Sequence, residues 1–131
     1  MRYFDWEKRL DNYLKTQAET EFVWGVNDCC HFAAKAAEII TGVGYGDLYP
    51  CADYKSAAEL LKKHGGVVCI ADNHYSRIAV KFAQRGDIVA ANVSRSDLSL
   101  GVCLGMYAVF KSQDSLLFAQ MKDFVQAWRV E

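Results

Sequence analysis

The periodicity of the sequence changes at Gly86, and this change constrains the fold more than any other feature. Before Gly86, apolar side chains recur at the three- and four-residue spacing of helices. After it, they fall in short runs rich in β-forming residues. Helices first and strands later is typical of the α+β class, in which helices cover one face or end of an antiparallel sheet. We therefore expect N-terminal helices packed on an antiparallel β-meander.

Local signals give approximate bounds for these elements. Helices are predicted over residues 5–15, 29–41 and 55–64. Asn27 or Asp28 is expected to cap the second helix, and Gly42 is a typical C-terminal glycine. Strands are predicted over residues 88–93, 100–104, 107–111, 116–119 and 127–130.

Composition narrows the class of protein further. With 131 residues, 52% hydrophobic composition and one proline, residues 1–131 are expected to form a single domain. The 15 basic and 16 acidic residues nearly cancel, so no charge excess points to nucleic acid or an anionic membrane surface. No run approaches the ~18 apolar residues of a membrane span, and the start MRYFDWEKRL carries charges where a secretory signal has its apolar core. We expect a chain kept in the cytosol, or carried in a particle assembled there.

The five cysteines do not predict a disulfide framework or a zinc site. They stand at positions 29, 30, 51, 69 and 103, an odd number without CxxC spacing. The contiguous set from Asp28 to His31 does not place its side chains on one helix face, so it is not expected to bind a metal. Reduced thiols, no metal and no cofactor are predicted.

Cys29 allows two interpretations. At the start of a helix, free backbone amides stabilise a thiolate and lower a pKa that begins near ~8.5, which favours a nucleophile. Cysteine is also one of the residue types most often buried as a small apolar side chain, which favours packing. His31 stands two positions from Cys29 and so does not share its helix face, which makes it a poor candidate base.

Four short motifs occur in an order that resembles a known superfamily. They are WGVNDC at residues 24–29, Thr41-Gly42 at a helix end, Gly86-Asp87 at a strand start, and AWRV at residues 127–130. Together they resemble the NlpC-type cysteine hydrolases, a papain-like superfamily that cuts bacterial cell-wall peptides. The sequence is most similar to a branch found in phage and prophage tail modules. The resemblance implies a papain-like NlpC-type fold.

The resemblance also implies which residues would form a catalytic site. Cys29 takes the nucleophile position, and the histidine of the family's His-Val-Gly pattern corresponds to Ser99 in the string SLGVCLG. A serine hydroxyl cannot take the thiol proton at neutral pH and return it to a leaving amine. His74, expected in a loop, is the candidate substitute base, whereas His64 is expected to be a surface residue or a helix-end cation.

Trp24 and Asp28 are the candidate substrate-binding residues. Trp24 could line a groove for a sugar or peptide, but aromatic residues beside turns in a small domain are more often core, and the same holds for Trp128. In an active relative the residue at Asp28 would orient a base, and in this sequence Asp28 is expected to serve as a helix cap or a first-turn anion. Its negative charge would raise the pKa of a neighbouring thiol.

These observations leave three functional hypotheses. The first is a structural or docking component of a phage tail tip or baseplate, with a degenerate active site. Its expected partners are other tail proteins and peptidoglycan, and its location is the virion. The second is an active endopeptidase or amidase that cuts peptidoglycan stem peptides during phage entry. The third is a bacterial binding domain unrelated to phage.

Overall fold

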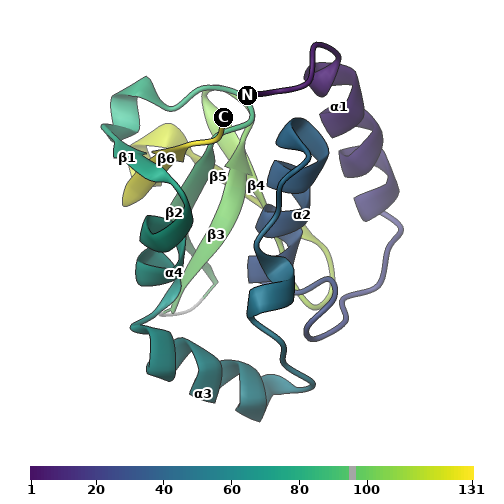
Figure 1. The fold of residues 1–131 in the computed structure, drawn as a ribbon, viewed down its shortest axis with the longest axis vertical. Coiled ribbons are helices and arrows are strands. Elements are labelled where there is room, and N and C mark those ends of the chain that lie inside the picture. Colours follow the sequence, from purple (N-terminus) through teal and green to yellow (C-terminus); the bar gives the residue numbers. More distant parts are fainter. Residues whose placement is uncertain (95–96) are drawn as a thin grey trace.

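The computed structural model describes residues 1–94 and 97–131 (Figure 1). Within them, four helices precede the long strands of one sheet: α1 (Trp6–Gln17), α2 (Cys29–Thr41), α3 (Tyr54–His64) and α4 (Val67–His74). None of the helices in these residues is both long and apolar enough to cross a membrane. The strands are β1 (Ser76–Ile78), β2 (Ile88–Ser94), β3 (Asp97–Cys103), β4 (Tyr107–Lys111), β5 (Leu116–Gln120) and β6 (Gln126–Arg129). The predicted α+β class is confirmed.

Four consecutive strands of the sheet form a meander, and the last strand of the chain pairs with the first strand of that meander. The strand order in the described residues is β1-β6-β2-β3-β4-β5, and every neighbouring pair is antiparallel. Strands β2 to β5 follow one another as the sequence predicts. The last strand, β6, instead returns to pair with β2, where Trp128 lies opposite Ile88, and β1 covers its outer edge. The expectation of a simple meander is therefore wrong for β6.

Helix α4 and strand β1 were not predicted from the sequence. Helix α4 has eight residues and follows Gly66, whose position has no side-chain cap. Only Val67, Ile70 and Ala71 of this helix are buried. A short helix without a cap gives little local signal, because most of its stability comes from packing. The expectation that His74 lies in a loop is wrong, since it is the last residue of α4.

The core lies on both faces of the sheet. Helix α2 lies between α1 and the sheet, and both helices stand on one side of it (Figure 1). Successive residues of a strand point to opposite faces. In β3, Leu100 and Val102 accordingly join the cluster under the helices, whereas Cys103 joins the cluster on the other face with Phe110.

A buried carboxylate joins the two ends of the chain. The side chain of Asp87 is fully buried and pairs with Arg2 Nη2 at 2.9 Å and with Arg129 Nε at 3.2 Å. It also accepts a hydrogen bond from the backbone N–H of Val130. Breaking such a pair by removing one partner typically costs about 3 kcal/mol. The Gly86-Asp87 motif therefore has a structural role, because Asp87 bonds to residues near both ends of the chain. The two termini lie side by side (Figure 1).

The β4–β5 hairpin is only partly core. Its large apolar side chains divide between the core and the surface. Phe110 is fully buried, and Leu116 and Leu117 pack against the two core clusters. Tyr107 and Phe118 are exposed and lie 5.9 Å apart between ring centroids.

Candidate functional site

The site begins at the turn that starts α2. Asp28 has extended backbone geometry, and its carboxylate accepts a hydrogen bond from the backbone N–H of His31 at 2.8 Å. This cap satisfies an amide that the helix leaves free and is worth about 1 kcal/mol. Cys29 is consequently the first residue of α2, as the sequence predicts.

The thiols of Cys29 and Cys30 shift each other's acidity in opposite directions. The adjacent Cys30 thiol lowers the pKa of Cys29, even though burial and the Asp28 charge oppose it. The interaction with Cys29, followed by burial, raises the pKa of Cys30 well above its ordinary value. Cys29 therefore has the more acidic thiol of the pair, which is the property that a nucleophile requires.

Ser99 lies on the face of the sheet that points away from α2. Its neighbours in β3, Leu98 and Leu100, pack against the cluster beneath the helices. Because side chains alternate along a strand, Ser99 points with Gly101 and Cys103 to the opposite face. Helix α2 packs on β3, but the side chain at the position corresponding to the family's histidine is not directed at Cys29.

His74 is held in an aromatic cluster. Its Nε2 lies 2.7 Å from the Tyr49 hydroxyl oxygen, and its ring stacks on Tyr45 with centroids 4.7 Å apart. Burial lowers the pKa of His74. The third histidine, His64, packs edge-on against Tyr49.

Cys29 has no histidine partner. All three histidines belong to the described part of the chain, and none of their ring nitrogens forms a hydrogen bond with the Cys29 sulfur. Tyr45 lies close enough to the thiols of Cys29 and Cys30 to interact with them electrostatically. Burial, followed by interaction with Cys30, raises the pKa of the Tyr45 hydroxyl well above its ordinary value. The hydroxyl oxygen of Tyr45 is buried without a hydrogen-bond partner.

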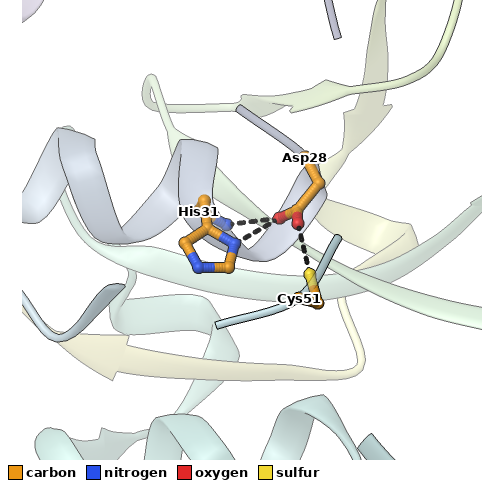
Figure 2. Close-up of side chains that lie close together, drawn as sticks. All are labelled: Asp28, His31 and Cys51. Atoms are coloured by element: carbon orange, nitrogen blue, oxygen red, sulfur yellow. Dashed lines mark hydrogen bonds and ion pairs between the residues drawn. The ribbon is translucent and has the colours of Figure 1, made fainter. Parts of the chain in front are cut away.

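Asp28 instead brings together a histidine and a different cysteine. His31 Nδ1 lies 2.7 Å from Asp28 Oδ1, and the Cys51 thiol donates to Asp28 Oδ2 at 3.4 Å (Figure 2). The other ring nitrogen of His31, Nε2, lies 3.1 Å from the carbonyl oxygen of Gly46. Figure 2 shows all three side chains converging at the first turn of α2, with Asp28 between the other two.

The acidities of these three groups follow from their contacts. Burial alone would raise the pKa of Asp28, but hydrogen bonds from His31 and Gly25 together lower it. The bond to Asp28 raises the pKa of His31, although burial opposes it. Burial, followed by the Asp28 charge, raises the pKa of Cys51 to about 11. Cys51 is therefore not an activated thiol, and both ring nitrogens of His31 are already engaged.

A glycine makes the approach of Cys51 to Asp28 sterically feasible. Gly25 has φ +80°, and a Cβ atom there would lie 2.0 Å from the carbonyl oxygen of Cys51. The N–H of Gly25 also donates to Asp28 Oδ2 at 2.9 Å. Only glycine accommodates both this left-handed backbone and this close contact. The glycine of the WGVNDC string thus has a structural role beside the site.

The candidate substrate-binding residues have structural roles. Trp24 is half-buried outside the core and packs edge-on against Phe22 and Tyr54, with ring centroids 4.8 and 5.9 Å away. The expectation that it is core is wrong, whereas Trp128 is fully buried as expected. Asp28 caps α2 as expected. A groove of about 570 Å³ opens beside His31 and is also lined by Tyr13, Gln17, Asn27 and Gly46.

Sequence reasoning missed the cluster of Asp28, His31 and Cys51. The three-residue spacing of Asp28 and His31 is visible in the sequence and places both on one helix face. Cys51 lies 23 residues beyond Asp28 in a loop, and no local pattern indicates that it returns. The ligand atoms of the three side chains lie within 4.8 Å of one another, so the cluster offers a set of metal ligands.

The comparisons with known proteins identify a family. None of the curated proteins matches this sequence. A family model described as a domain of unknown function, DUF6950, matches residues 1–130. Since the match extends over nearly the whole sequence, the chain belongs to the DUF6950 family.

Proposed function

We propose that this chain is a structural or docking component of a phage or prophage tail tip or baseplate, and that it has no peptidase activity. The observation that carries the proposal is the isolation of Cys29. Its thiol stands at the start of a helix, but no histidine nitrogen accepts its proton. Thiol catalysis of peptide cleavage needs a group that takes this proton and returns it to the leaving amine. The tail assignment draws on the motif resemblance to tail-module proteins.

The way in which the candidate bases are held supports the loss of activity. His74 is bonded to Tyr49, His31 is bonded to Asp28 and Gly46, and Ser99 points to the far face of the sheet. Recruiting a histidine would require breaking one of these hydrogen bonds, and recruiting Ser99 would require a different strand register. A papain-like scaffold in this arrangement retains the nucleophile position without its catalytic partner.

An active cysteine hydrolase is the second candidate, and one observation favours it. The adjacent Cys30 thiol lowers the pKa of Cys29, which increases the thiolate fraction near neutral pH. To act as an unorthodox base, His74 would have to leave its hydrogen bond with Tyr49 and its stacking on Tyr45. Peptidoglycan stem peptides would be the substrate in that case.

Assembly experiments on the phage that encodes the chain test the proposal. We expect purified tail particles to contain the chain, and deletion of its gene to give defective tails. A Cys29→Ala chain should restore assembly and infectivity to the wild-type level. Intact tails that lack the chain, or particles that assemble with Cys29→Ala but fail to infect, would contradict the structural role.

A further inference from the structure

We propose that Asp28, His31 and Cys51 form a binding site for one divalent zinc-class ion, which links the loop containing Cys51 to the first turn of α2. The site adjoins Cys29 but does not use its thiol, and it does not depend on the tail assignment. It uses three donor types at the end of one helix and in one loop (Figure 2).

The distances suit a tetrahedral ion. Zinc bonds of 2.0–2.3 Å to oxygen, nitrogen and sulfur imply separations of roughly 3.3–3.8 Å between its ligand atoms. Cys51 Sγ and Asp28 Oδ2 are already 3.4 Å apart. His31 Nδ1 and Asp28 Oδ1 are 2.7 Å apart, so that pair must open by roughly half an ångström. The third pair, His31 Nδ1 and Cys51 Sγ, lies within 4.8 Å, so these two side chains must close or keep their separation by rotation about their own bonds.

The chemistry of the donors favours zinc over magnesium or calcium. Thiolate and imidazole are ligands of zinc-class ions, whereas Mg²⁺ and Ca²⁺ prefer an all-oxygen set. A carboxylate and a thiolate also balance the two positive charges, which matters because Asp28 and His31 are 3% and 8% exposed. Binding would displace the proton that Cys51 donates to Asp28 and the proton shared between Asp28 and His31 Nδ1.

The outer contacts of the ligands are already in place. His31 Nε2 can donate to the Gly46 carbonyl oxygen, the type of bond that orients metal-binding histidines. Asp28 accepts hydrogen bonds from the backbone N–H groups of Gly25 and His31, which fix its carboxylate.

His31 lines the groove and Cys51 is half-buried, so two of the three proposed ligands are open to solvent from outside the core. Three protein ligands leave one tetrahedral position, which water or a donor atom of a molecule in the groove can take. The site thus combines a neutral ligand set, oriented ligands and access from solvent.

Titration of the reduced full chain with Zn²⁺ and with Co²⁺ tests the site. We expect one equivalent to bind, the midpoint of thermal unfolding to rise with Zn²⁺, and the Co²⁺ form to show a sulfur-to-metal charge-transfer band in the near ultraviolet. Cys51→Ser should abolish that band. His31→Ala should weaken Zn²⁺ binding by more than about tenfold, because even the loss of a group that only hydrogen-bonds to a metal ligand lowers metal affinity by about that much.

Matched variants separate this site from other thiols. Cys69→Ser removes an exposed thiol elsewhere, and Cys29→Ser removes the helix-start thiol, so both should keep the charge-transfer band. Their circular dichroism, compared with that of Cys51→Ser, shows whether each variant is folded. No binding by the wild-type chain, or a band that survives Cys51→Ser but disappears in Cys29→Ser, would overturn the proposal.

Discussion

His74 Nε2 lies 2.7 Å from the Tyr49 hydroxyl oxygen, and this hydrogen bond engages the one histidine that the sequence offered as a substitute base. Tyr45 stacks on the same imidazole with ring centroids 4.7 Å apart. The aromatic cluster therefore fixes His74 as a packing element. Cys29 keeps a thiol whose pKa is lowered, and among the described residues no histidine nitrogen forms a hydrogen bond with it.

Thiol labelling should distinguish Cys29 from Cys51. The adjacent Cys30 thiol lowers the pKa of Cys29, whereas burial and then the Asp28 charge raise the pKa of Cys51 to about 11. Because the thiolate is the reactive form, Cys29 should react faster with iodoacetamide at pH 8. Peptide mass spectrometry gives both rates in a Cys69→Ser background, which removes the exposed thiol. Faster modification of Cys51 would show that the contacts at the start of α2 are wrong.

Restoring a histidine at position 99 should not create activity. The Ser99 side chain points to the face of the sheet away from α2, so Ser99→His would place its imidazole far from the Cys29 sulfur. We expect Ser99→His to release no more peptide from peptidoglycan fragments than the wild-type chain does. Cleavage that appears in Ser99→His and disappears when Cys29→Ala is added would mean that the strand register differs.

Gly25→Ala should destabilise the fold more than Gly66→Ala. Both glycines have positive φ, +80° and +96°, so alanine strains the backbone at either position. A Cβ at Gly25 also meets the Cys51 carbonyl oxygen at 2.0 Å, whereas nothing lies within 4 Å of a Cβ at Gly66. Strain of this kind costs about 1–3 kcal/mol, and the clash adds to it. Urea unfolding of both variants gives the comparison, and equal losses would contradict the close approach.

Acid should remove the contribution of Asp72 to stability. Hydrogen bonds from Arg77, then from Trp128 Nε1, lower the pKa of Asp72 to about 2. The folded pKa lies below the unfolded value of about 3.9, so the stabilisation is present above pH ~4 and declines as the pH falls towards 2.

Asp72→Asn provides the measurement. It should lower the free energy of unfolding at pH 6, and its difference from the wild-type chain should shrink as the pH falls from 4 to 2.5. A difference that stays constant over this range would refute the ionic role of Asp72. Asp5→Asn is the control, because Asp5 forms an exposed ion pair with Arg9 that should have little effect.

The bounds of α2 could be predicted from the sequence because both ends of the helix have typical capping residues. Asp28 caps the first turn, and Gly42 takes the left-handed conformation with φ +86°, so both bounds could be predicted from neighbouring residues. The strands β2 to β5 were predicted for the same reason, since each is an apolar run with turn residues beside it. Helix α4 lacks such signals and is held by its packing.

The arrangement of the site depends on contacts that sequence patterns do not reveal. The face on which Ser99 lies follows from strand register, where a shift of one residue reverses the side chain. The approach of Cys51 to Asp28 depends on the space that Gly25 leaves across the chain. The thiol at the start of α2 was therefore predictable, whereas the partners around it were not.

Digestion of purified peptidoglycan tests the central claim most directly. The full chain and its Cys29→Ala variant would each be incubated with the polymer and with its stem-peptide fragments, and newly released amino groups would be counted. We predict that neither protein releases more than the buffer control, because no described histidine can take the Cys29 proton. Turnover by the wild-type chain that disappears in Cys29→Ala would contradict this account.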